Sequence, residues 1–122
     1  MHIYTIISTL LTLTFLITGG MKLYLPKEKI IANGGAWAET FTEPFIKLLG
    51  VIEVICGLGI GIGGRFPIPP IIYIFFISII MVLMLGASFM HYQRKEYPLL
   101  TGTLVLLAMT FYILYNDFLK FL

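Results

Sequence analysis

Long runs without a single acidic or basic side chain constrain this chain more than any other feature. Three runs contain no Asp, Glu, Lys or Arg, residues 1–21, 66–93 and 97–116, and residues 45–64 contain only Lys47 and Glu53. A helix rises about 1.5 Å per residue, so about 20 apolar residues cross the roughly 30 Å of hydrocarbon in a bilayer. The runs therefore predict four membrane-spanning helices.

The composition agrees with a membrane protein and excludes several soluble classes. Apolar residues make up 59% of the 122 residues and charged residues 11%, whereas soluble domains carry about 25% charged residues. The net charge of +2 is too small and too scattered for a nucleic-acid-binding surface. We therefore expect one integral membrane domain that contacts the lipid bilayer and binds no nucleic acid.

A transmembrane β-barrel is the alternative to helices. It would need strict alternation of apolar and polar side chains over at least about eight strands, and residues 71–80 and 105–111 do not alternate. We therefore predict an all-α, up-down bundle of four transmembrane helices. The predicted spans are residues 3–24, 44–64, 69–92 and 98–117.

Capping residues and prolines mark the predicted helix ends. The triplet Thr-Glu-Pro at residues 42–44 provides an N-cap, a first-turn acid and an early proline for the second span. Pro70 and Pro98 can occupy the first turns of the third and fourth spans. Between the first two spans we expect a single loop, residues 27–41, in which Trp37 is an interfacial anchor.

The first segment differs from a cleaved signal peptide. It lacks a basic amino-terminal region, and its apolar stretch exceeds the usual length of about 7–15 residues. We therefore expect the first span to be retained in the membrane.

Basic residues indicate how the bundle is oriented. One side of the membrane holds six of them, Lys22, Lys27, Lys29, Lys47, Arg94 and Lys95, and the other side holds Arg65 and Lys120. Because loops rich in Lys and Arg stay in the cytoplasm, we expect the first side to be cytoplasmic and both termini to lie outside.

Glycines follow one face of the second predicted span. They are Gly50, Gly57, Gly61 and Gly64, which recur at intervals of seven, four and three residues. The pair Gly57 and Gly61 forms a small-xxx-small motif, which lets another helix backbone approach closely in a membrane. We expect this face to pack against a neighbouring helix.

Glu53 lies on the same face and raises an energetic problem. It follows Lys47 by six residues, about 9 Å along a helix, and an unpaired charge within the membrane costs about 3 kcal/mol on insertion scales. Lys22 ends the first span and His91 ends the third, at the same membrane level. We expect Lys22, Glu53 and His91 to form a polar cluster that holds a ligand or a proton. The alternative is that Lys22 and Glu53 form only an ion pair between two helices.

Cysteine and histidine are too few for several cofactor sites. The single cysteine, Cys56, rules out a Cys-x-x-Cys pair and a cysteine-based zinc or iron–sulfur site, and we interpret it as an inert packing residue. His2 and His91 fall on opposite sides of the membrane, which excludes a haem ligated by both. We expect no covalently bound cofactor and no metal ion.

Short motifs in order along the chain resemble one known family. They are Gly19-Gly20-Met21-Lys22-Leu23, Gly50-Val51-Ile52-Glu53, a proline turn at residues 67–70, and Gly86-Ala87 followed by His91. The pattern resembles the DoxX-like family of small four-span membrane proteins. The resemblance implies a bacterial inner-membrane protein, and Lys22, Glu53 and His91 are the positions through which its function would carry over.

The sequence and the resemblance together leave three hypotheses for the function. Its name comes from a subunit of an archaeal thiosulfate:quinone oxidoreductase, similar bacterial proteins are linked to quinones and oxidative stress, and similar animal proteins assist receptor assembly. The first reading is a redox-linked accessory protein that handles a quinone and receives electrons from a partner protein. The second is a non-catalytic assembly subunit, and the third is a small transporter acting as a homo-oligomer.

None of these readings makes the chain an enzyme by itself. In the quinone reading, Lys22 and His91 donate hydrogen bonds to the quinone oxygens and Glu53 relays a proton. Aromatic side chains would hold the ring between them. The candidates for this role are Phe89, Tyr92, Tyr97, Phe111 and Tyr112.

The orientation can be tested with a cysteine placed at Leu122 and labelled by a membrane-impermeant thiol reagent on intact cells. We expect labelling before lysis, because the basic residues place the carboxyl terminus outside. A cysteine at Lys95 is the matched control and should be labelled only after lysis. The reverse pattern would invert the predicted orientation.

Overall fold

Four long helices form the body of the protein. The computed structural model describes residues 3–33 and 35–121, with side chains up to residue 119. The long helices are α1 (Ile3–Tyr24), α3 (Glu43–Gly63), α4 (Pro70–Gln93) and α5 (Tyr97–Phe121). Each is long and apolar enough to cross a membrane. This confirms the predicted all-α bundle of four spans, and the described part of the chain contains no strand. The expectations about His2, Leu122 and the Lys120 side chain fall outside it.

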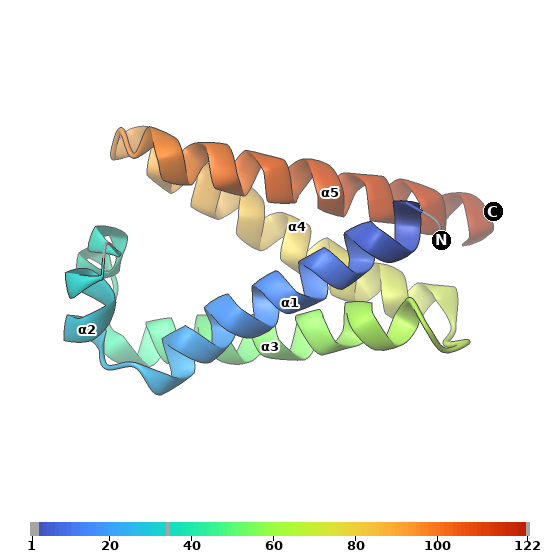
Figure 1. The fold of residues 1–122 in the computed structure, drawn as a ribbon, viewed down its shortest axis with the longest axis horizontal. Helices are drawn as coiled ribbons and strands as arrows, with labels where there is room; N and C mark the ends of the chain where they lie inside the picture. Colours follow the sequence, from blue (N-terminus) through green and yellow to red (C-terminus); the bar gives the residue numbers. More distant parts are fainter. Residues whose placement is uncertain (1–2, 34, 122) are drawn as a thin grey trace.

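The helices are arranged as two antiparallel pairs. Helix α1 packs along α3, and α4 packs along α5 (Figure 1). The pairs meet at the end that holds the chain termini and draw apart toward the end that holds α2 (Figure 1). The buried apolar core contains residues of all four long helices, among them Leu11, Ile60, Ile77 and Ile113.

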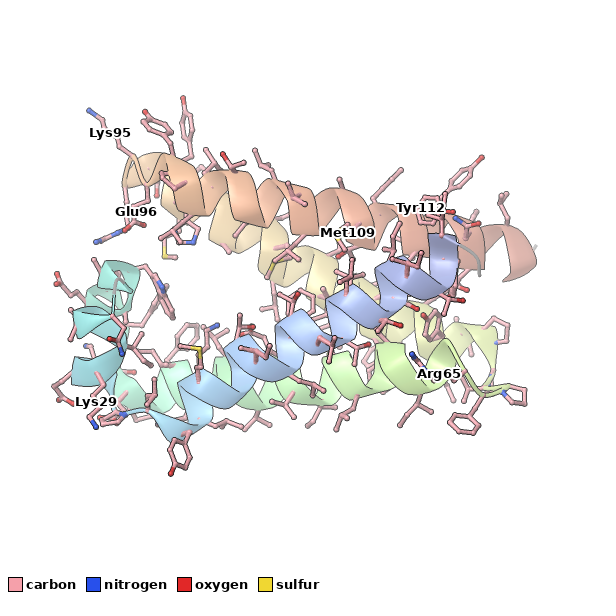
Figure 2. The ribbon with its side chains drawn as sticks, in the orientation of Figure 1. Lys29, Arg65, Lys95, Glu96, Met109 and Tyr112 are labelled. Carbon is pink, nitrogen blue, oxygen red and sulfur yellow. The ribbon has the colours of Figure 1, made fainter. Side chains whose placement is uncertain are left out.

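Charged side chains gather at the two ends of the bundle. Lys29, Lys95 and Glu96 lie at the end where the pairs diverge, and Arg65 lies at the opposite end (Figure 2). Arg65 donates to the Thr9 hydroxyl at 2.9 Å and so ties the start of α1 to the end of α3. The long faces between these ends are apolar, as a bilayer requires.

The segment between the first two spans is more ordered than the sequence suggested. We expected a loop over residues 27–41, which is wrong, because the segment folds into α2 (Lys27–Ala32) and the short 3-10 helix η1 (Ala36–Thr40). Ile30, Ala38 and Ile46 form a small second core beneath it, with Trp37 packed against them. The segment therefore has apolar contacts of its own that hold it over one end of the bundle.

The residues predicted to cap the start of α3 do so in the structure. The Thr42 hydroxyl accepts a hydrogen bond from the Phe45 amide at 3.4 Å, and Pro44 lies in the first turn. This hydrogen bond satisfies one of the backbone amides that the first turn of a helix leaves unpaired.

The glycine face of α3 lies against α1. A Cβ atom added at Gly50 would come within 2.8 Å of the Gly19 carbonyl oxygen, and one added at Gly19 within 2.9 Å of the Gly50 carbonyl oxygen. Further along, Gly57 faces Phe15. Gly61 and Gly64 face Thr12 and Ser8. The two backbones are therefore in direct contact where Gly19 meets Gly50.

This contact predicts that Gly50→Ala destabilises the protein. The added methyl group would meet backbone rather than a flexible side chain, and overpacking of this kind costs about 1–3 kcal/mol. Gly20→Ala is the matched control, because a Cβ atom there meets nothing within 4 Å. Thermal unfolding in mild detergent should show a lower midpoint for Gly50→Ala only. Equal midpoints would mean that the two helices do not pack through this face.

Candidate functional site

A buried ion pair joins α1 and α3. The Lys22 ammonium lies 2.8 Å from Glu53 Oε2, and the Thr18 hydroxyl donates to Glu53 Oε1 at 2.8 Å. Glu53 is only 5% exposed. Both carboxylate oxygens therefore have a partner, which offsets the cost of placing the charge inside the membrane.

The direction of the side chains brings the pair together. Each Cβ in a helix tilts toward that helix's own amino terminus. Helices α1 and α3 run antiparallel and touch at Gly19 and Gly50. Along the helix axes, the Lys22 side chain therefore points toward Glu53 and the Glu53 side chain points toward Lys22. One ammonium hydrogen points to Glu53, and the Lys22 nitrogen also lies 5.3 Å from the centre of the Trp37 ring. Lysine has three such hydrogens, so further donor capacity remains.

The ion pair forms part of the wall of a cavity between the helix pairs. The cavity has a volume of about 550 Å³, within the range of about 300–1,000 Å³ that is usual for small-molecule sites. Lys22, Glu53 and His91 all line it. Most of the remaining lining is apolar, and the aromatic part consists of Phe15, Trp37, Phe41 and Phe45.

The aromatic residues that we predicted from the sequence to hold a ligand ring are not the ones that line the cavity. Phe89, Tyr92, Tyr97, Phe111 and Tyr112 are all exposed, and none of them lines this cavity. They lie on the outer faces of α4 and α5, where the membrane would cover them. The aromatic lining comes instead from α1, from the start of α3 and from the segment before it.

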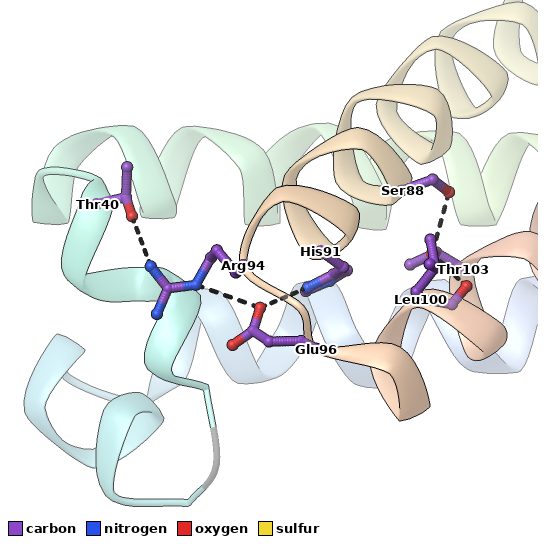
Figure 3. A network of polar contacts seen from close by, with 7 residues as sticks. All are labelled: Thr40, Ser88, His91, Arg94, Glu96, Leu100 and Thr103. Atoms are coloured by element: carbon purple, nitrogen blue, oxygen red, sulfur yellow. Dashed lines mark hydrogen bonds and ion pairs between the residues drawn. The ribbon is translucent and has the colours of Figure 1, made fainter.

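His91 lines the cavity and belongs to a second polar network (Figure 3). Its Nδ1 atom lies 2.9 Å from Glu96 Oε1, and Arg94 Nε lies 3.3 Å from the same oxygen. Arg94 also donates to the Thr40 hydroxyl at 3.3 Å. The network therefore joins the α4–α5 turn to η1, and it holds His91 without contacting Glu53.

The α4–α5 turn aims Glu96 back at His91. Lys95 adopts a left-handed backbone with a φ of 58°, and the Glu96 amide then donates to the His91 carbonyl at 2.9 Å. Burial disfavours the charged Glu96 carboxylate, but hydrogen bonds from His91 and Arg94 outweigh it and hold the pKa of Glu96 below its usual value. Glu96 is therefore an acceptor at neutral pH.

This fixes which nitrogen of His91 is available. Because Glu96 accepts, Nδ1 must carry the hydrogen of their shared bond, and in the neutral ring Nε2 is then an acceptor. Among the residues described, no group forms a hydrogen bond with Nε2. We expected His91 to donate a hydrogen bond to a ligand. In the neutral ring, Nε2 would instead accept one.

Two polar contacts were missed from the sequence. Lys47 donates to three carbonyl oxygens at the end of α1, those of Lys22, Leu23 and Leu25, at 2.8, 3.1 and 2.6 Å.

At the opposite end of the bundle the Tyr4 hydroxyl lies 3.0 and 2.9 Å from the two oxygens of the buried Asp117 carboxylate. A carboxylate near a helix end gives little signal in a sequence, because such residues are usually solvated.

Comparison with known protein families identifies the family of this chain. The model of the DoxX-like family matches residues 6–113, which confirms the resemblance seen in the motifs. No curated protein and no solved structure gave a match. Within the described ranges, no three His, Cys, Asp or Glu side chains lie close enough to hold a metal ion.

The ion pair predicts a specific pattern of stability. Lys22→Met leaves the Glu53 carboxylate buried with Thr18 as its remaining partner, and breaking a buried pair costs about 3–5 kcal/mol. Adding Glu53→Gln removes the stranded charge, so the double variant should recover most of the lost stability. Thermal unfolding of both variants in detergent tests this. If Lys22→Met unfolds at the wild-type temperature, the pair contributes nothing to the fold.

Proposed function

Because the chain belongs to the DoxX-like family and carries an ion pair in the wall of a membrane-embedded cavity, we propose that it is a redox-linked accessory protein that binds a quinone-type molecule there. The observation that carries the proposal is the position of the pair. Glu53 is buried and the Lys22 side chain is only 16% exposed, yet both line the cavity.

The lining suits a flat ring with polar oxygens at its edge. Phe41 and Trp37 lie with their ring centres 6.2 Å apart, and Phe41 and Phe45 lie 5.0 Å apart. These aromatic side chains provide apolar contact, while a few converging polar groups fix the orientation of a ligand. Lys22 can donate to a quinone carbonyl, and neutral His91 can accept from a hydroxyl of the reduced form.

Glu53 supports proton movement in the same cavity. It is held by Thr18 and Lys22 at 2.8 Å each, so it can accept a proton without leaving its place. The single cysteine gives the chain no thiol pair, and in this proposal a partner protein supplies the electrons. The family resemblance favours a bacterial inner membrane. The basic residues favour an orientation with the η1 end of the bundle in the cytoplasm and both termini outside.

One observation favours a different function. Thr18 and Lys22 together satisfy both oxygens of Glu53, as a simple clamp between α1 and α3 would require. In that case the protein is a non-catalytic assembly subunit, and the cavity holds lipid.

The quinone proposal can be tested through Trp37, the only tryptophan of the chain. Trp37 lines the cavity, and quinones quench tryptophan fluorescence on close contact. Titration of the purified protein with a short-chain benzoquinone should give saturable quenching. The double variant Glu53→Gln with Lys22→Met should weaken the apparent affinity about tenfold or more, because one charged hydrogen bond is worth about 1.5–3 kcal/mol.

The double variant Glu28→Gln with Lys29→Met is the matched control, since both side chains are exposed and the two changes likewise remove one negative and one positive charge on the same side. It should bind as the wild type does. Saturable quenching that is unchanged in the double variant of Lys22 and Glu53 would identify these two residues as a clamp. No saturable quenching in the wild type would leave the assembly function as the better reading.

A further inference from the structure

The wall of the cavity is incomplete on one side. Among its lining residues, Phe45 on α3 is 41% exposed and Val82 on α4 is 67% exposed. Gly86, one turn after Val82, is exposed as well. A residue that lines a cavity and is also exposed marks a place where the cavity reaches the outer surface.

The opening lies between α3 and α4. One edge of α4 faces α5, where Met81 and Leu85 share a shallow groove with α5 residues. Leu83, Ala87 and Met90 line the main cavity from the other edge of α4. The opening at Val82 and Gly86 therefore adjoins the edge that faces α3, and Phe45, near the start of α3, lies toward the end of the opening nearest the membrane surface.

The opening lies at the depth of the hydrocarbon. Gly86 precedes the end of α4 at Gln93 by seven residues, about 10 Å along the helix, and Val82 precedes it by about 16 Å. The hydrocarbon core is about 30 Å thick, so the opening extends to the middle of the membrane. Lipid chains, and not water, would meet the cavity here.

The end of the cavity nearest the membrane surface is covered. Trp37 and Thr40 of η1 line this end, and the hydrogen bond of 3.3 Å from Arg94 to Thr40 crosses from the α4–α5 turn to η1 (Figure 3). A ligand that arrived from water would have to displace this segment. A ligand already dissolved in the membrane would not.

We propose that the ligand enters sideways from the bilayer between α3 and α4, and that it is a quinone carrying a long alkyl or isoprenoid chain. The ring lies against Lys22 and Trp37, and the chain passes Gly86 into the lipid. This inference rests on the proposed function, and it adds the class of quinone and its route of entry.

Gly86→Phe tests the route. A Cβ atom at Gly86 meets nothing within 4 Å, so a phenyl ring can occupy the opening without straining the helix contacts. Gly102→Phe on α5 is the matched control, because its Cβ atom also meets nothing within 4 Å and it does not line the cavity. Trp37 quenching is measured in lipid nanodiscs with a long-chain quinone, given as a mole fraction of lipid, and with its tail-less ring.

We expect Gly86→Phe to weaken binding of the long-chain quinone about tenfold or more and to change binding of the tail-less ring less than about twofold. Gly102→Phe should leave both unchanged. Unfolding midpoints of the two variants confirm that each is folded.

Three results would overturn the inference. Unchanged binding of the long-chain quinone by Gly86→Phe would mean that the chain does not pass this residue. Equal loss of both ligands would mean that position 86 belongs to the ring site. Binding of the tail-less ring alone by the wild type would refute the long-chain ligand while the proposed function stands, whereas binding of neither would refute the proposed function itself.

Discussion

The close approach of α1 and α3 at Gly19 and Gly50 determines how the rest of the molecule can be arranged. Helices in a bilayer gain little hydrophobic free energy by packing, so their association depends on van der Waals contact and polar bonds. The two glycines allow backbone contact and set the level of the helices, so that Lys22 and Glu53 lean toward each other. The pair α4 and α5 then joins at the terminal end of the bundle and diverges at the other (Figure 1), which leaves the cavity beside the ion pair.

The sequence could predict the parts of this arrangement that follow from helix geometry. Three charge-free runs and a fourth with only Lys47 and Glu53 predicted the four spans, and the spacing of Gly50 and Glu53 placed the glycine face and the carboxylate on one side of α3. The outward direction of the aromatic side chains on α4 and α5 could not be predicted, because these helices are apolar on most of their surface and periodicity does not tell which face meets lipid. A helix of six residues such as α2 is too short for a periodic signal. The contact of Glu96 with His91 depends on the left-handed turn at Lys95, which no sequence pattern here indicated.

Among the residues that the structure describes, the two buried carboxylates, Glu53 and Asp117, have different surroundings. Asp117 is paired with Tyr4 at the end where the helix pairs meet, and Tyr4 packs against the main apolar core. Glu53 is paired just as closely, but it lies where the helix pairs separate and it lines the cavity. A polar pair that only holds helices together is better enclosed, because a low dielectric strengthens it and excludes competing water. The location of Lys22 and Glu53 is therefore more costly than a clamp requires, which favours a role toward a ligand.

The charge of the pair limits what that ligand can be. Lys22 and Glu53 carry opposite charges 2.8 Å apart, so together they add no net charge to the cavity. A bound cation or anion would therefore gain no net charge–charge attraction from the pair. Either ion would also add a desolvation cost of several kcal/mol in a membrane interior. A neutral ring with a carbonyl dipole avoids this cost, and it can accept from the remaining Lys22 hydrogens while Glu53 keeps its own partners. The electrostatics of the cavity and its opening toward lipid therefore favour the same kind of molecule, one that is uncharged, polar at one edge and otherwise apolar.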